Sequence, residues 1–124
     1  MPVDAERIAG KLSLRNDMRL WLKLTFRREN HIYGPGMQEL IRLVGETGAL
    51  ETAYSLMGMS ASHARSFIKE TEAGLGFKVF DNNLKCKLDG STVTEEAKEF
   101  AAKYETFQEA CLESVESLFK HHFK

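Results

Sequence analysis

The chain has 124 residues, of which 43% are hydrophobic, and a formal net charge of −1. This is enough apolar material for one small globular domain, and no apolar run approaches the length that a bilayer span requires. The polar, acidic start "MPVDAERIAG" does not have the pattern of a signal peptide, and two isolated cysteines suit a reducing compartment. We therefore expect a cytoplasmic protein.

Charge is distributed unevenly along the chain. Residues 11–31 carry a local net charge of +4, whereas residues 94–119 carry −5. This asymmetry favours two different working faces, although a solvated helix surface would also explain the acidic half.

The first patterned segment is "RLWLKLTFR" at residues 19–27, which follows an N-terminal arm at residues 1–18. Its alternation of apolar and polar side chains predicts a half-buried strand, and "HIY" can return as the second strand of a hairpin. Trp21 lies on the polar side of this alternation, where either solvent or a partner molecule could cover it.

Three helices are expected after this hairpin. The first opens at "GPG", carries one apolar stripe, and has Gly48 as its expected left-handed cap. A shorter helix stops at Gly58, and Ser60 is a good N-cap for a third helix, which should end at Gly74 and Gly76. Two helices that meet at a glycine turn form either a structural corner or a DNA-reading unit.

A second hairpin is expected after the third helix. The run "LKCKL" places Lys85 and Lys87 on one face, and Asp89-Gly90 then turns the chain into "STV". Asp-Gly between two alternating runs is a strong hairpin signal. Two lysines on one face of such a hairpin could straddle a DNA backbone.

The last helix, capped by Thr94, should run to about Lys120, roughly 26 residues, which is longer than the usual globular helix. Its apolar surface is wider than a small domain covers alone, so we expect a homodimer. The alternative is a helix that lies lengthwise on its own domain. The residues expected at the dimer interface are Trp21, Tyr104, Phe107, Cys111, Val115 and Leu118.

The order of these elements predicts a mainly α structure with small β elements (α+β). More specifically, it predicts a winged helix-turn-helix at residues 19–93 with an N-terminal β-hairpin, followed by a dimerisation helix at residues 94–124. The third helix would present its first turns to the major groove, where base edges are distinguishable. We assign base contacts to Ser62, His63 and Ser66, and phosphate contacts to Ser60, Arg65, Lys69, Lys85 and Lys87.

Several motifs together resemble the N-terminal winged-helix domain of ModE, the molybdate-responsive transcription regulator, which is related to LysR-type regulators. They are "RLWLKL", "YGPG", "ETGAL", "MGMS" and "VTEEA", within residues 19–110. The resemblance implies a dimer on operator DNA, in which the third helix reads the bases and the long helix pairs the subunits. Full-length ModE carries C-terminal molybdate-binding domains, and the chain ends before them, so molybdate sensing is not expected.

The chain departs from the family pattern on the surface that would meet DNA. The family has Ser-Tyr-Lys or similar where this chain has Ser60-Ala61-Ser62, and Arg65 replaces a tryptophan. Asn82 stands where an arginine is common. These departures and the low net charge favour the alternative that the protein is a winged-helix homodimer that has lost DNA binding and acts through protein–protein interaction. The basic first strand and the Lys85/Lys87 hairpin count against that alternative, so DNA binding stays the main expectation.

An enzyme is not expected. Cysteine and histidine side chains are scattered, and the adjacent His121 and His122 point to different faces of a helix. Ser62 and His63 are sequence neighbours, which does not make them a nucleophile–base pair. "GLG" follows a helix and is a cap, not a phosphate loop. We therefore expect no catalytic residue, metal site or cofactor.

Overall fold

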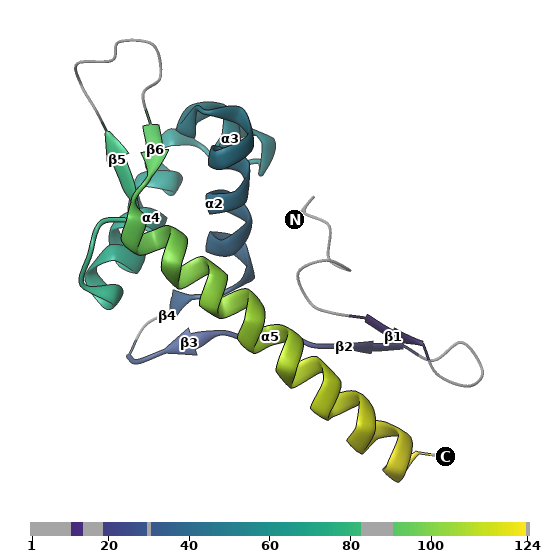
Figure 1. Ribbon diagram of the computed structural model, residues 1–124. Coiled ribbons are helices and arrows are strands. Elements are labelled where there is room, and N and C mark those ends of the chain that lie inside the picture. The colour runs from purple at the N-terminus through teal and green to yellow at the C-terminus, as the bar shows by residue number, and fades with distance from the viewer. Residues whose placement is uncertain (1–10, 14–18, 30, 83–90, 124) are drawn as a thin grey trace.

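The computed structural model describes residues 11–13, 19–29, 31–82 and 91–123. Within these ranges the chain is mainly helical, with short strands in antiparallel pairs, which confirms the expected α+β class (Figure 1). In chain order the elements are β1 (Lys11–Ser13), β2 (Arg19–Trp21), β3 (Phe26–Arg27), β4 (His31–Tyr33), α2 (Pro35–Thr47), α3 (Leu50–Leu56), α4 (Ala61–Leu75), β5 (Phe80–Asn82), β6 (Ser91–Val93) and α5 (Glu95–His122). No helix in these ranges is both long and apolar enough to cross a membrane.

The predicted strand at residues 19–27 has the expected alternation but is not one continuous strand. Burial alternates with period two from Leu20 to Arg27. β3 pairs with β4, as the hairpin prediction requires, and an irregularity lies between Phe26 and Arg27. β2 instead pairs with β1, which lies in the segment treated above as an arm. The two pairs are separate two-stranded sheets, because no strand is assigned between them at residues 22–25.

Four aromatic rings join the β3–β4 hairpin to α5. The ring centroids of Tyr33 and Phe100 are 4.6 Å apart, those of Tyr33 and Tyr104 are 5.1 Å apart, and those of Phe26 and Tyr104 are 5.5 Å apart. The Tyr104 hydroxyl donates a hydrogen bond of 2.7 Å to the carbonyl oxygen of Leu24. Edge-to-face aromatic pairs with a satisfied hydroxyl are a strong way to join two elements. We call these four residues the aromatic junction.

Hydrogen bonds from the first turn of α2 extend this junction. The Tyr33 hydroxyl donates to Oε1 of Gln38, and Nε2 of Gln38 donates to the carbonyl oxygen of Ala101 at 3.0 Å. Burial raises the pKa of Tyr104 to about 12 and also raises the pKa of Tyr33, with a contribution from Tyr104. Both hydroxyls therefore stay protonated and able to donate at neutral pH.

The three central helices lie close to where the sequence predicts them. Gly48 caps α2 with a φ of 75°, and Gly58 follows α3 with a φ of 79°, both in the left-handed region that glycine favours. Ser60 caps α4 as expected. The predicted stop at Gly74 is wrong, because α4 continues to Leu75 and Gly76 is its left-handed cap.

The hairpin after α4 uses a different strand from the one predicted. β5 pairs with β6 in the register Phe80↔Val93 and Asn82↔Ser91. The strand opposite β6 is thus Phe80–Asn82, upstream of the predicted "LKCKL" run. That run and the predicted Asp89-Gly90 turn lie outside the described residues.

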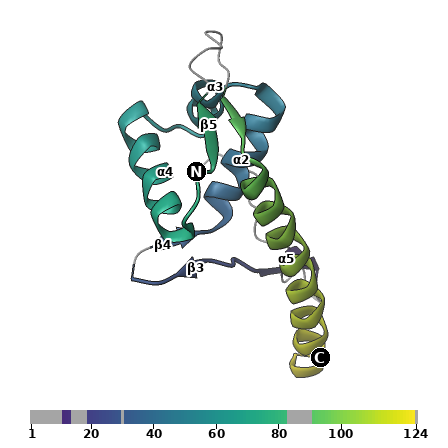
Figure 2. The ribbon, with the colours of Figure 1, turned by 60° about the vertical axis from the view of Figure 1, so that its left-hand side comes forward.

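The last helix, α5, confirms the predicted long helix. It has 28 residues, and the Thr94 side chain caps it by accepting a hydrogen bond from the backbone N–H of Ala97. Figures 1 and 2 both show its C-terminal half extending beyond α2, α3 and α4. The fully buried residues of α5, Ala97 and Tyr104, both lie in its N-terminal half.

Two helical glycines give opposite expectations for alanine substitution. A Cβ on Gly74 would lie 2.7 Å from Cγ2 of Ile32, whereas a Cβ on Gly45 would have nothing within 4 Å. We expect Gly45→Ala to stabilise the protein by up to about 1 kcal/mol, because alanine is the better helix former. We expect Gly74→Ala to destabilise it, because β4 and α4 must separate, at a cost of about 1–3 kcal/mol.

Urea denaturation of both variants against the parent protein measures these effects. Equal stabilisation by the two alanines would contradict the close approach of α4 to Ile32.

Candidate nucleic-acid interface

One face of α4 is exposed and polar. Ala64 and Thr71 on the opposite side are each 1% exposed and turn into the core. The predicted base-contact residues and the α4 members of the predicted phosphate set are all exposed, as a DNA interface requires: Ser60, Ser62, His63, Arg65, Ser66 and Lys69.

The N-terminus of α4 is organised by Ser60. Its Oγ accepts a hydrogen bond of 3.2 Å from the backbone N–H of His63. A serine hydroxyl keeps its own proton as a donor while it accepts, so capping does not prevent Ser60 from contacting a phosphate. The helix dipole also favours an anion at this end.

A hollow of about 450 Å³ lies between α4, the start of α3 and β5. We call it the α4–β5 hollow. It gathers four of the predicted DNA-contact residues, while Ser60 and His63 lie outside it. Its lining residues are Leu50, Ser62, Arg65, Ser66, Ile68, Lys69, Glu72, Lys78 and Phe80.

Lys78 is the cation in this hollow that sequence reasoning missed. It lies between the cap of α4 and β5, next to the fully buried Val79. The sequence offered no clear signal for this role, because Lys78 precedes two consecutive buried residues, Val79 and Phe80, and its partners in the hollow lie on another element. The predicted contacts Lys85 and Lys87 lie outside the described residues.

Three cations and one carboxylate line the α4–β5 hollow. The carboxylate is Glu72, whose Oε2 accepts a hydrogen bond of 2.8 Å from the backbone N–H of Val79. Glu72 therefore holds the strand entry in place as well as offsetting part of the positive charge. With Arg65, Lys69 and Lys78 present, the hollow keeps a positive balance that suits an anionic ligand.

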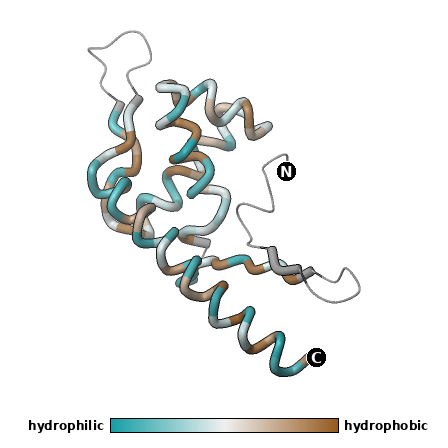
Figure 3. Tube along the Cα trace, turned by 45° about the vertical axis from the view of Figure 1, so that its right-hand side comes forward, coloured by the Kyte–Doolittle hydropathy of each residue, from teal (hydrophilic) through white to brown (hydrophobic). Residues whose placement is uncertain are grey.

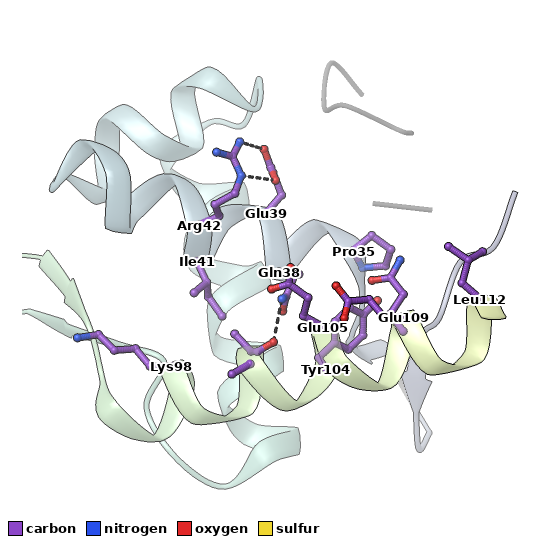
Figure 4. Close-up of a pocket in the computed structure, with 13 residues that line it drawn as sticks. Pro35, Gln38, Glu39, Ile41, Arg42, Lys98, Tyr104, Glu105, Glu109 and Leu112 are labelled. Atoms are coloured by element: carbon purple, nitrogen blue, oxygen red, sulfur yellow. Dashed lines mark hydrogen bonds and ion pairs between the residues drawn. The ribbon is translucent and has the colours of Figure 1, made fainter. Parts of the chain in front are cut away.

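A second hollow, the α2–α5 groove, lies in the angle between those two helices (Figure 4). It measures about 420 Å³, and Pro35, Ile41 and Leu112 contribute apolar surface. At its edge Glu39 and Arg42 are hydrogen bonded, and this contact raises the pKa of Arg42.

The predicted dimer residues divide into three groups by burial. Trp21, Phe107 and Leu118 are 48%, 50% and 57% exposed, and Cys111 and Val115 are half-buried. Figure 3 shows hydrophobic segments continuing along the C-terminal half of α5. Tyr104 is a correction to the predicted interface: it is 2% exposed, because the aromatic junction of its own chain covers it.

Comparison with known proteins supplies no relative, since no family model matches the chain and no curated protein is significantly similar to it. The resemblance to ModE regulators therefore depends on the quoted motifs alone.

The capping role of Ser60 is separable from any ligand contact. We expect Ser60→Ala to lower the free energy of unfolding by about 1 kcal/mol, because the N–H of His63 loses its acceptor. The matched control is Ser62→Ala, an exposed serine on the same turn, which should change stability by less than about 0.5 kcal/mol. Chemical denaturation without DNA measures both, and equal stabilities would show that the cap contributes nothing.

Proposed function

We propose that the protein is a transcription regulator that binds operator DNA sequence-specifically as a homodimer. Its DNA-binding unit would be a winged helix-turn-helix similar to that of the ModE regulators. The observation that carries this proposal is the exposed polar face of α4, which borders the cationic α4–β5 hollow.

The element order and the local geometry support α4 as the recognition helix. α3 and α4 are joined by a turn at Gly58, and the β5–β6 hairpin follows α4. Small polar side chains at Ser62 and Ser66 would let the helix lie deep in the major groove, where each hydroxyl can donate to or accept from base edges. His63 is exposed on the first turn and adds a further polar contact.

The charged residues support backbone binding around that helix. Arg65 and Lys69 lie beside Ser62 and Ser66, so a phosphate could be bound while the serines face the bases. Contacts of this kind fix the register of the protein on the duplex without reading its sequence.

The homodimer is supported by apolar surface on α5 that the described chain leaves open. Phe107 and Leu118 are half or more exposed, and the α2–α5 groove runs along the same helix. A second copy of α5 would cover these side chains and present two recognition helices to one duplex. Their spacing would set half-sites about one DNA turn, or ~34 Å, or a multiple of it, apart.

Binding to random duplex DNA over a salt series tests the DNA proposal. We expect micromolar or tighter binding near 50 mM salt, with a steep negative slope of log affinity against log salt, as phosphate contacts require. Replacing both Arg65 and Lys69 by glutamine should flatten that slope by about 2. The matched control replaces Lys103 and Lys120, two exposed lysines on α5, and should leave the slope unchanged.

Fluorescence anisotropy measures the affinity for DNA and its dependence on salt. A folded dimer that binds no DNA near 50 mM salt would overturn the proposal in favour of a protein-binding winged helix. If DNA binds, selection from a random library should return a pseudo-palindrome.

Association is tested by charge placed at two adjacent positions of α5. We expect Leu118→Glu to raise the dimer dissociation constant at least about tenfold, or about 1.4 kcal/mol, because a carboxylate would enter an apolar interface. Ser117→Glu adds the same charge at an exposed neighbour about 100° around the helix and should have little effect. Sedimentation equilibrium measures both, and a monomeric parent protein or equal effects would contradict the α5 interface.

A further inference from the structure

Lys78 has an unusually well-defined backbone position for an exposed lysine. Its carbonyl oxygen accepts a hydrogen bond of 2.6 Å from Oγ1 of Thr94, the cap of α5. The next N–H, on Val79, donates to Glu72 of α4, and the Val79 carbonyl accepts from the backbone N–H of Thr94 at 3.0 Å. The backbone around Lys78 is thus held from both α4 and the cap of α5, so that only the side chain, and not the backbone, has to become ordered when it binds a ligand.

The surroundings of Lys78 indicate what that ligand would be. Arg65 and Lys69 line the same hollow from the side of α4, so three cations converge from two separate elements. Cations that converge on one opening suit a phosphodiester, which offers charged oxygens to several donors at once.

We propose that the α4–β5 hollow binds one phosphate of the DNA backbone and that Lys78 is its principal contact. This inference rests on the proposed function and extends it. Lys78 would fix the distance between the recognition helix and the duplex, because the adjoining backbone is hydrogen bonded to Glu72 of α4 and to Thr94, the cap of α5. The phosphate would lie between α4 and the base of the β5–β6 hairpin.

Glu72 should weaken the binding of a phosphate at Lys78, so removing its charge should change DNA affinity in the opposite direction to removing the charge of Lys78. Its carboxylate lines the same hollow and would repel the phosphate. Glu72→Gln removes the charge but keeps an oxygen that can accept from Val79 N–H. The hollow would then hold three cations without a counter-charge, and DNA should bind more tightly.

The experiment measures DNA affinity of Lys78→Gln, Glu72→Gln and the control Lys103→Gln by anisotropy over a salt series. Lys78→Gln should bind about fivefold more weakly to every sequence, and its salt slope should be shallower by about 0.9. Glu72→Gln should bind several-fold more tightly, and Lys103→Gln should match the parent. Circular dichroism confirms that each variant is folded.

The outcomes separate this inference from the proposed function. If the parent does not bind DNA, both are overturned. If the parent binds and Arg65 and Lys69 contribute, but Lys78→Gln behaves like Lys103→Gln, only the role of Lys78 is overturned.

Competition by inorganic phosphate tests whether the α4–β5 hollow binds a phosphate of the DNA backbone or a free anion. At constant ionic strength it should compete no better than chloride, because the proposed contact needs the rest of the duplex. Competition by phosphate that disappears in Lys78→Gln would identify a small-anion site and overturn the assignment to DNA.

Discussion

The aromatic junction is the constraint on which the arrangement of this protein depends. Tyr33 and Tyr104, each almost completely buried, bring β4 and α5 together. Gln38, in the first turn of α2, accepts a hydrogen bond from the Tyr33 hydroxyl of β4 and donates one to the carbonyl oxygen of Ala101 in α5. α2 packs against α3 and α4 packs against β4, whereas α5 carries the exposed Phe107 and Leu118. The junction therefore sets how the DNA-binding surface proposed for α4 is oriented relative to the interface proposed for α5. A change there should alter the spacing of two recognition helices without touching either surface.

Elements with strong local signals could be predicted from the sequence. Gly48, Ser60 and Thr94 act as caps because glycine tolerates a positive φ and hydroxyl side chains accept from helix N–H groups, and both properties are local. The exposed face of α4 followed from helical periodicity in the same way. These features placed five candidate DNA contacts on the exposed surface of one helix, and a sixth at its cap, before any tertiary contact was known.

Features that depend on distant segments could not be predicted in this way. Gly74 looks like a helix stop, but in the structure it lets α4 approach Ile32 of β4. Tyr104 fits the apolar stripe of α5 equally well as an interface residue or as a core residue, and only its hydrogen bond to Leu24, 80 positions away, decides for the core. Lys78 was missed for the same reason, since its place in one hollow with Arg65 and Lys69 depends on tertiary contacts such as the hydrogen bond from Val79 N–H to Glu72 of α4. The pairing of β6 with Phe80–Asn82 depended on register, which a short alternating run does not determine.

The most direct test of the DNA-binding account is to map the amide chemical shifts of the ¹⁵N-labelled protein during titration with duplex DNA at low salt. The account requires the shifted amides to cluster on the exposed face of α4 and around Lys78, with the C-terminal half of α5 unchanged. Shifts confined to α5, or none at all from a folded dimer, would contradict it and would identify α5 as the working surface of the protein.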